Sequence, residues 1–483
     1  ILTDPQNLDL LADSPSTYND SGNGVGNYAT LNPLAATGTL SLSNGNLDYT
    51  ATSAANNECF SSIQLNGGKF YFEGNLIDAD DVPGSTSFRF GIAKNLSGSN
   101  IIIYNATGDF ETLGTTDTSP SSYTAGNTIG VAVDCVDGSI EFFKDGSSEG
   151  TKTFTVGTDV WTAYIRIYKG GGNDVNGTIN FGQRAFAYTP PTGYKALNTF
   201  NTDTPLIDDP SEHFDTKKWD GNSSTQTISG YGFSPDFAWI KVRSEAARSH
   251  FLFDTIRGAT NVLKSDATDI EQAYSTSLTA FNSDGFDLGA WANVNNNTKT
   301  IVGWAWNAGS EDPETNDAGS IDSEVKANPS AGFSIVKWDT LSTAETVGHG
   351  LNATAEFILM KTINTSGQWS VYHKDVGPSK YFDFTDDDPS TNSLMYTTAP
   401  TSSVFSPGDG VVNTSIYDEM IAYCWAPVEG YSKFGSWDGN NSSDGPFVHT
   451  NFRPAFLLWK RSNGSANWYI YDSSRSTVNV VND

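Results

Sequence analysis

The stretch Phe333-Ser-Ile-Val-Lys-Trp-Asp339 opens a unit that ends near Gly430, and its landmarks recur on both sides of it. A Trp-Asp pair leads to an apolar run that begins with Phe and ends with Lys. The Trp-to-Lys interval is 22 residues in the first copy (219 to 241) and 23 in the others (338 to 361, 437 to 460). The two complete copies close on Trp after 65 and 64 more residues (241 to 306, 361 to 425). This agreement indicates internal duplication. The landmarks are Trp219, Asp220, Phe237, Lys241 and Trp306; Trp338, Asp339, Phe357, Lys361 and Trp425; and Trp437, Asp438, Phe456 and Lys460.

The fold class follows from the pattern within and between these units. A period near 100 residues is too long for a solenoid and is typical of a string of small domains. Short β-branched or aromatic runs broken by Asn-Gly, Asp-Gly and Ser-Gly predict hairpins, and long windows of helix-forming residues are absent. We predict an all-β chain, in which a β-sandwich precedes tandem repeated β-sandwich-like domains. The third copy reaches Asp483 before its closing half, so we interpret the sequence as part of a longer chain.

The predicted division has seven parts. They are a lead-in at 1–39, a sandwich at 40–195, a linker at 196–212, a first repeat domain at 213–310, an acidic linker at 311–332, a second repeat domain at 333–430 and a partial third repeat domain at 431–483. The acidic segment is read as a solvated linker, and an arm that reaches a neighbouring domain is the alternative.

Charge and cysteine content restrict the partners and the compartment. The formal net charge of −29 disfavours a nucleic-acid partner, because phosphate backbones repel such a protein. The three cysteines, Cys59, Cys135 and Cys424, are too few for a disulfide framework, so we expect unpaired thiols and folding in a reducing compartment. No run of 18 apolar residues is present, so no membrane span is predicted.

The clearest hairpin lies in the predicted sandwich. The segment Ile129-Gly-Val-Ala-Val-Asp-Cys135 places Ile, Val, Val and Cys on one strand face. Asp137-Gly138 supplies the turn, and a return strand begins at Ile140. We predict that this hairpin lies in the core. Upstream, Lys69-Phe-Tyr-Phe-Glu73 alternates in the manner of a half-buried strand.

These segments, together with Asn180-Phe-Gly-Gln-Arg184 and the Pro-Pro-Thr-Gly tail after it, resemble the SPRY domain family over residues 40–195. The resemblance implies a bent two-sheet β-sandwich whose loops form a binding surface. The loops that recognise peptides in animal members have no residue-by-residue match here, so no binding residue is carried over.

The wider order of motifs resembles large, tail-fibre-like virion structural proteins of marine bacteriophages. It comprises Asp13-Ser-Pro15, Ala29-Thr-Leu-Asn-Pro33, the SPRY-like region, and blocks that close on Gly303-Trp-Ala-Trp306 and Ala422-Tyr-Cys-Trp425. The resemblance implies a non-enzymatic component of the particle, assembled in the host cytoplasm. Its partners would be other virion subunits, copies of itself among them, and a glycan or protein of the host surface. Two alternatives stay open: a tail-spike enzyme that degrades polysaccharide, and an intracellular SPRY adaptor that binds peptides.

The sequence nominates no catalytic residue and no cofactor. The five histidines lie in different blocks without metal-ligand spacing. The acidic clusters Asp78, Asp80, Asp81 and Asp386, Asp387, Asp388 would supply oxygen ligands for a hard cation. They lack the alternating order of a calcium loop, so a solvated turn is the preferred reading.

The recurring landmarks suggest packing rather than ligand binding. Trp buries most of its large surface, so we expect Trp219, Trp338 and Trp437 in equivalent core positions rather than on a sugar platform. Exposed aromatic residues are better sought outside the landmarks, at Tyr104, Tyr123 and Tyr274. A regular strand would turn each landmark Lys inward with its Phe, so we predict either a bulge or strand end between the two or an acid or carbonyl partner for the ammonium group. Among acids, the candidates are Asp220, Asp339 and Asp438.

Overall fold

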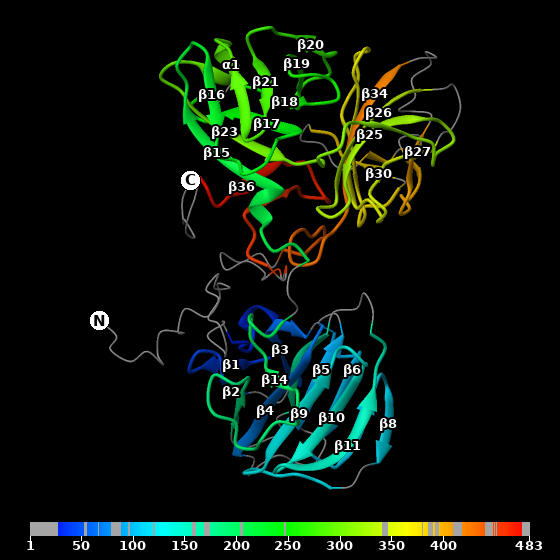
Figure 1. Cartoon of the computed structure of the whole chain (residues 1–483). Helices are drawn as coiled ribbons and strands as arrows, with labels where there is room; N and C mark the ends of the chain where they lie inside the picture. The colour runs from blue at the N-terminus through cyan, green and yellow to red at the C-terminus, as the bar shows by residue number, and fades with distance from the viewer. Residues whose placement is uncertain are drawn as a thin grey trace. The chain divides into compact units, whose positions relative to one another are not determined.

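The structure is a computed structural model, and its regular structure is almost entirely β (Figure 1). It describes residues 28–475 except 53–55, 66, 79–87, 95–96, 119–120, 157–160, 169–173, 203–205, 246–247, 341–345, 379, 385–389, 392–395, 409–417, 440–447, 449 and 451. Within these residues one short α-helix and two 3-10 turns accompany the strands, which confirms the predicted all-β class. None of the helices described is long and apolar enough to cross a membrane.

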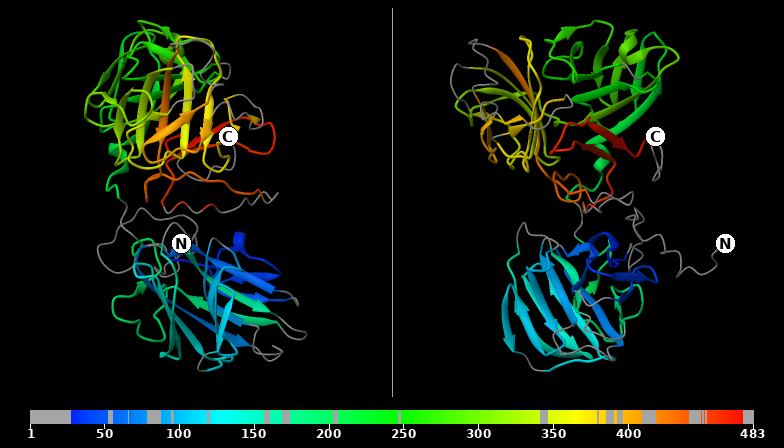
Figure 2. Two further views of the ribbon diagram at one scale, coloured as in Figure 1. Left: turned by 90° about the vertical axis from the view of Figure 1, so that its right-hand side faces the viewer. Right: turned by 180° about the vertical axis from the view of Figure 1, so that it is seen from behind.

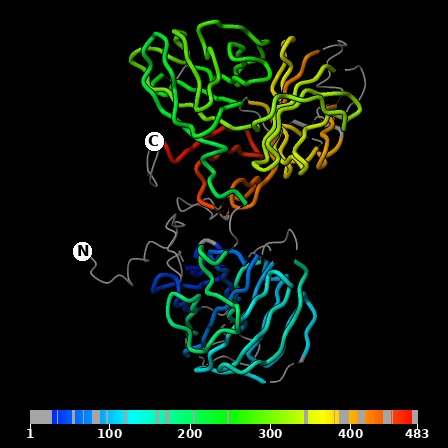
Figure 3. The backbone as a smooth tube through the Cα atoms, viewed as in Figure 1, coloured from blue at the N-terminus to red at the C-terminus, as the bar shows by residue number. Residues whose placement is uncertain are grey.

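Two compact units divide the chain. Residues 1–204 group with 437–453, and residues 205–436 group with 454–483. Figure 3 follows the backbone through the blue-to-cyan strands of the first unit and the green-to-red strands of the second. Each unit has its own buried core, so each is described by itself.

The first unit is a two-sheet sandwich. Val131 and Phe90 come from different sheets and share one buried cluster, as a two-sheet sandwich requires. The larger sheet has the order β1 (Leu40–Ser43), β2 (Asp48–Ala51), β13 (Val175–Asn180), β4 (Lys69–Asp78), β9 (Thr128–Asp134), β10 (Ser139–Lys144), β11 (Ser147–Thr153), and β14 (Lys195–Ala196) pairs with β4. The other sheet has the order β3 (Asn56–Leu65), β12 (Trp161–Tyr168), β5 (Phe88–Lys94), β6 (Ile101–Asn105), β7 (Asp109–Thr112), β8 (Thr115–Thr118), and the 3-10 turn η2 (Pro33–Ala35) precedes β1.

The predicted hairpin is confirmed in register and in burial. Strands β9 and β10 pair with Ile140 opposite Val133, and both side chains are fully buried. Gly138 has a φ of 72°, which glycine adopts without strain, so the Asp-Gly turn is used as predicted. Strand β4 differs from its prediction, because Tyr71 and Glu73 are buried as well as the phenylalanines between them. The segment after β13 covers this second face.

The second unit contains one large and one small sheet for each complete repeat. The first repeat has the large order β15 (Phe214–Asp220), β23 (Thr300–Trp306), β17 (Phe237–Val242), β18 (His250–Asp254), β19 (Asn261–Lys264), β20 (Gln272–Ala273) and the small order β16 (Gln226–Ser229), β22 (Gly285–Leu288), β21 (Leu278–Asn282), with η3 (Pro210–Glu212) before it and α1 (Ala292–Asn295) before β23. The small sheet packs on one face of the large sheet and encloses a core of its own.

The second repeat follows the same plan, and the third supplies a hairpin. The second has the large order β24 (Glu314–Asn316), β25 (Ser323–Asn328), β26 (Phe333–Asp339), β34 (Glu419–Trp425), β28 (Phe357–Thr362), β29 (Ser370–His373), the small order β27 (Val347–Gly348), β33 (Val404–Pro407), β32 (Tyr396–Thr398) and the pair β30 (Lys380–Tyr381), β31 (Ser390–Thr391). The third repeat contributes β35 (Phe456–Trp459) and β36 (Tyr469–Asp472).

Each large sheet is buried on both faces. In β17, Phe237 and Trp239 enter one cluster, whereas Ala238 and Ile240 enter the core beneath the small sheet. The first of these clusters also receives side chains from the second repeat and from the hairpin of the third, for example Leu359. Figure 2 shows the red hairpin lying against the strands of both complete repeats. The repeats therefore share a core, and the predicted string of separate domains is instead one packed unit.

The acidic segment 311–332 also differs from its prediction. It forms β24 and β25, which extend the large sheet of the second repeat beyond β26. Within β25, Ser323 and Val325 are buried, so an alternating pattern places this segment on a packed sheet. Lys326 of β25 makes a 2.8 Å ion pair with the buried Asp236 of the first repeat. The segment is thus the arm that sequence reasoning kept as its alternative.

Candidate functional site

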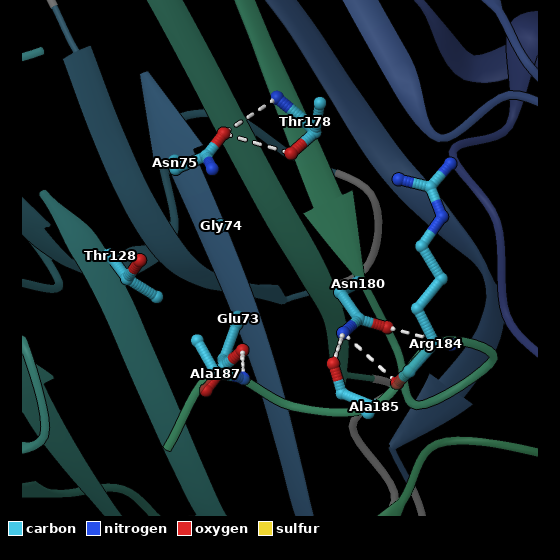
Figure 4. Close-up of a pocket in the computed structure, with 9 residues that line it drawn as sticks. All are labelled: Glu73, Gly74, Asn75, Thr128, Thr178, Asn180, Arg184, Ala185 and Ala187. Carbon is cyan, nitrogen blue, oxygen red and sulfur yellow. Dashed lines mark hydrogen bonds between the residues drawn. The ribbon is translucent and has the colours of Figure 1, made fainter. Parts of the chain in front are cut away.

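A shallow depression opens on the larger sheet of the first unit (Figure 4). It lies over β4, β9 and β13, beside the segment that follows β13. Its volume is about 190 Å³. Pockets that enclose small-molecule ligands usually measure about 300–1,000 Å³, so this depression is too small to enclose one.

The carboxylate of Glu73, in this depression, is engaged by the protein itself. It accepts hydrogen bonds from the backbone N–H groups of Ala187 (2.7 Å) and Tyr188 (3.0 Å). The hydroxyl of Tyr71 donates a third bond of 3.0 Å. The two backbone donors hold the segment after β13 against β4, so Glu73 has a structural role here.

The remaining polar groups of the depression shape the same segment. The side-chain amide of Asn180 donates to the carbonyl oxygens of Arg184 (3.1 Å) and Ala185 (3.2 Å). The side-chain oxygen of Asn75 accepts a 2.8 Å bond from the hydroxyl of Thr178. Figure 4 shows these bonds beside the Arg184 side chain, which turns away from Glu73. The Asn180–Arg184 motif that supported the SPRY resemblance thus stabilises a loop.

The candidate cation ligands lie largely outside the described residues. Asp80, Asp81 and 386–388 are not described, and Asp78 ends β4 with its side chain not described. Among the side chains that are described, no group of three or more His, Cys, Asp or Glu residues has the geometry of a metal site. All three cysteines are buried and none is in a disulfide, as predicted.

Two histidines, the half-buried His250 and the buried His349, are engaged in internal hydrogen bonds. The indole N–H of Trp239 donates to Nδ1 of His250 at 2.9 Å, and burial lowers the pKa of His250 to about 3. The backbone N–H of Leu351 donates to Nδ1 of His349 at 3.2 Å, which leaves Nε2 to donate to a carbonyl oxygen 3.1 Å away. Both imidazoles are therefore neutral packing elements.

The landmark tryptophans divide into two groups. Trp219 and Trp338 are buried, and each packs on a phenylalanine of the small sheet in its own repeat. Trp437 differs from the expectation, because 44% of its surface is exposed and it lies outside any described strand. The proposed exposed aromatics also differ, since Tyr104 and Tyr123 are buried in the core of the first unit. Tyr274 is half-buried and stacks on Trp291.

Each landmark lysine caps the turn of its own hairpin. The ammonium group of Lys361 donates to the carbonyl oxygen of Gly367 at 2.7 Å. Lys241 donates to the carbonyl of Arg248 and Lys460 donates to that of Ala466. Carbonyl oxygens six or seven residues downstream are therefore partners of the ammonium groups of Lys361, which is buried, and of Lys241 and Lys460, which are half-buried.

The aspartates predicted as partners of these lysines lie in exposed positions. Asp220 and Asp339 are exposed at the ends of β15 and β26. Within the described residues neither makes an ion pair with Lys241 or Lys361, and Asp438 is exposed outside any strand. The candidate Asp–Lys pairing is wrong, because the pleat directs these aspartates to the solvent rim of the sheet.

The landmark aromatic residues meet in the shared core of the second unit. Trp306 and Trp425, which close the two complete repeats, have ring centroids 6.0 Å apart. Trp306 lies 5.5 Å from Phe456, and Trp425 lies 5.6 Å from Phe357 and 6.3 Å from Phe237. Residues that are far apart in the sequence thus join all three repeats.

A buried ionic group accompanies this aromatic core. Asp254, at the end of β18, accepts from the backbone N–H of Arg257 (2.8 Å) and pairs with its Nε (2.5 Å). Arg257 also pairs with Glu271 at 2.9 Å. The hydroxyl of Tyr423, from the closing strand of the second repeat, donates to Asp254 at 2.7 Å. Although burial opposes charge, Asp254, Tyr423 and Glu271 raise the pKa of Arg257 above its ordinary value.

The third repeat builds the same group. Asp472 accepts from the backbone N–H of Arg475 at 2.7 Å and pairs with its Nε. Its third donor is the indole N–H of Trp304, at 3.0 Å, from the closing strand of the first repeat. Trp304 and Tyr423 each stand two residues before a closing Trp. One repeat therefore supplies an Asp-x-x-Arg acceptor, and another supplies an aromatic donor.

Three indole hydrogen bonds between repeats have the same sense. Trp369 of the second repeat donates from its indole N–H to the carbonyl of Lys264 in the first, at 2.8 Å. Trp468 of the third donates to the carbonyl of Asp383 in the second, at 2.7 Å. Trp304 of the first donates to the third. Three heterologous junctions of the same sense close a ring.

Comparison with known families assigns the region that contains this ring. Residues 209–483 match the family described as "Domain of unknown function (DUF7483)". This match covers more than half of the chain. The chain belongs to the DUF7483 family. The DUF7483 region contains the three repeats and their junctions, and the sandwich of residues 40–195 lies outside it. No curated protein matches the sequence.

Several solved SPRY-domain structures are similar to about a third of the chain. The SPRY domain of human HERC1 is 18% identical, with a TM-score of 0.29, over 32% of this chain and 99% of that one. A human SPRY domain is 14% identical, with a TM-score of 0.24, over 30% and 96%. The TRIM65 PSpry domain is 12% identical, with a TM-score of 0.25, over 32% and 91%. The two-sheet description of the first unit rests on its own strand pairing.

Sequence reasoning missed the ionic groups of the DUF7483 region. Asp254-Thr-Ile-Arg257 and Asp472-Ser-Ser-Arg475 have the same spacing and follow the landmark Lys by similar intervals. This shared Asp-x-x-Arg spacing could have identified the two ionic groups from the sequence. The second copy has His373 and Val376 at these positions, so a search for an invariant motif in all three copies would overlook the pattern.

Proposed function

We propose that this protein is a structural component of a bacteriophage particle. It acts through protein–protein contacts, as a fibre, tail or surface-projecting element, and it touches a glycan or protein of the host surface. Its other partners are virion subunits, including copies of itself. It assembles in the host cytoplasm and stays with the particle. The sequence resemblance to marine phage virion proteins suggests this identity.

The observation that carries the proposal is the use of the recurring residues. The landmark aromatics Trp306 and Trp425 and the Asp254–Arg257 group, which receives the Tyr423 hydroxyl, pack one repeat on another. The side chains that recur in the diverged copies make packing contacts inside the protein. This use favours a structural role for the region over a catalytic one. The high negative charge keeps such a protein soluble at the concentrations that assembly requires.

A particle composition experiment tests this proposal. Phage particles from the virus that encodes the chain are purified by two successive density gradients and digested for mass spectrometry. We expect peptides from both units at a constant ratio to the major capsid protein across the gradient peak, and immunogold labelling at one position on the particle. A chain found only in the infected-cell lysate, and absent from particles, would overturn the proposal.

A further inference from the structure

One position in the large sheets differs between the first repeat and the other two. In β18, His250 lies opposite the landmark Lys241. Continuing the registers of the second and third hairpins places Trp369 and Trp468 opposite the equivalent lysines. Each of these indoles donates to a backbone carbonyl of a neighbouring repeat. The first repeat therefore carries an imidazole, which can take up a proton, where the other repeats carry an uncharged indole.

His250 packs against the junction between the first and third repeats. Its ring lies parallel to that of Trp304, with an interplanar angle of 8° and centroids 6.2 Å apart. The indole N–H of Trp304 donates to Asp472 of the third repeat at 3.0 Å. The guanidinium carbon of Arg475, which pairs with Asp472, lies 5.1 Å from the centroid of the Trp304 ring. The imidazole is therefore next to the aromatic residue through which the two repeats are joined.

The closed junction requires a neutral imidazole. Nδ1 of His250 accepts the indole N–H of Trp239 at 2.9 Å, so the proton of the neutral ring is on Nε2. A solvent proton that binds Nδ1 converts the ring to an imidazolium, which donates from both nitrogens and accepts at neither. The N–H of Trp239 then faces a second donor, and the hydrogen bond is lost. Because Trp239 is buried in the shared core, water replaces this bond only if the side chains move apart.

Two cations oppose protonation of His250 in the closed junction. Burial lowers the pKa of His250 to about 3, and the charges of Lys241 and Arg475 act in the same direction. Lys241 extends from β17 of the first repeat, and Arg475 follows β36 of the third. A protonated His250 would be a third cation in this space, and the repulsion would act across the junction.

Other charged groups near β18 are engaged with partners of their own. Asp472 is bound by the arginine and the indole of the junction. In β19, the next strand of the sheet, Lys264 pairs with Asp269 at 2.6 Å. From the second repeat, Phe384 packs on Trp239 and adds no charge. The described surroundings of His250 therefore favour the neutral imidazole.

We propose that His250 is a pH switch at the junction between the first and third repeats, which is closed when the imidazole is neutral and opens when it is protonated. Opening exposes the imidazole to water and separates it from Lys241 and Arg475. The other two repeats have Trp369 and Trp468 at this position, so the contacts that these residues make do not take up a proton. The switch belongs to the second unit alone and does not depend on the virion assignment.

The direction of the pH effect follows from the two protonation states. The pKa of His250 is about 3 in the closed junction, against an ordinary value of 6.5 for an exposed imidazole. Between these values the open form binds the proton and the closed form does not, so a lower pH favours opening. Closure is most stable above pH 6.5 and weakens progressively as the pH falls toward 3. Between pH 7 and pH 5, His250 should raise the equilibrium constant for opening about twentyfold.

Exchange of the Trp304 indole proton measures opening of the junction. The full chain is labelled with ¹⁵N at tryptophan, and NMR follows the exchange at pH 7 and pH 5, with correction for the intrinsic exchange rate. In the wild type we expect the opening constant to be about twentyfold higher at pH 5. His250→Gln keeps an acceptor for the Trp239 N–H and cannot be protonated, so it should lose this rise. His250→Trp, which introduces the residue of the other repeats, should lose it as well.

His349→Gln is the matched control, because His349 is a buried histidine that makes its hydrogen bonds within the second repeat. This variant should retain the rise at Trp304. The proposal is overturned if the wild-type opening constant does not change with pH, or if either His250 variant keeps the full rise. Equal loss of the rise in His349→Gln and His250→Gln would also overturn it, because acid would then loosen the second unit as a whole.

Discussion

The hydroxyl of Tyr423 donates a 2.7 Å hydrogen bond to the buried carboxylate of Asp254, which lies 169 residues earlier in the sequence. The two residues belong to different repeats, and the ring of Tyr423 also stacks on Phe237 with centroids 4.2 Å apart. The contact therefore links the closing strand of one sandwich to the hairpin of another. Its counterpart, from Trp304 to Asp472, links the first repeat to the third.

The Tyr423 hydroxyl should stabilise the second unit measurably. Tyr423→Phe removes the donor and leaves the ring, so we expect a loss of about 1–2 kcal/mol in the free energy of unfolding, as for a bond to a charged group. Urea unfolding followed by Trp fluorescence measures it. Tyr469→Phe, at an exposed ring, is the control and should change stability by less than about 0.5 kcal/mol. Equal effects in the two variants would show that the bond contributes nothing specific.

Arg257 should be harder to replace than its equivalent Arg475. Arg257→Met leaves the carboxylate of Asp254 buried beside an apolar chain, which should cost about 3–5 kcal/mol. The side chain of Arg475 is 23% exposed, so water can compensate Asp472 in part, and Arg475→Met should cost less. Chemical denaturation of the two variants gives the comparison. A larger loss for Arg475→Met would contradict this ranking.

Lys361 should make stability depend on alkaline pH. Burial lowers the pKa of Lys361 to about 8, against an ordinary value of 10.5. Between pH 8 and pH 10.5 the Lys361 amine is protonated in the unfolded chain and neutral in the folded chain. The contribution of Lys361 to the free energy of unfolding therefore rises with pH. Lys361→Met lacks this group. The wild type should gain about 2 kcal/mol relative to Lys361→Met between pH 7 and pH 10. A stability difference that is constant across this range would argue against the lowered pKa.

The first unit should respond separately to a charge in its core. Val133→Asp places a carboxylate among the fully buried side chains of β9 and β10, at a cost of several kcal/mol. Because the two units have separate cores, we expect calorimetry of the full chain to lose or lower one transition and keep the other. Val136→Lys, in the exposed turn of the same hairpin, is the control. An unchanged thermogram for Val133→Asp would exclude the assigned strand register.

The sequence predicted what depends on local pattern. The alternation at Ile129–Cys135 and the Asp137-Gly138 turn specify a hairpin and its buried face without help from the rest of the chain. The closely similar spacings of Trp219 and Trp338 to their lysines, 22 and 23 residues, identified the repeats. Strand alternation also indicated that the Lys361 side chain points inward, because residues four apart in a strand lie on the same face and Phe357 is buried.

The packing of repeats on one another was beyond local pattern. In β17 the apolar residues are continuous rather than alternating, which signals burial on both faces but does not say what covers the second face. Asp254 and Arg257 become a site only when Tyr423 arrives from another repeat. The segment 311–332 was predicted to be a linker because it is rich in acidic residues. The alternation of buried and exposed positions at Ser323 and Val325, which is typical of a strand, was not recognised.

The central structural claim is that the three repeats share one core and unfold together. Hydrogen exchange of the Trp425→Leu variant tests it most directly, because Trp425 closes the second repeat and contacts Phe237 of the first. We expect faster exchange at the amides of β17 and β18 in the first repeat to the same degree as in β28 and β34, with β9 of the first unit unchanged. Faster exchange confined to the second repeat would contradict a shared core.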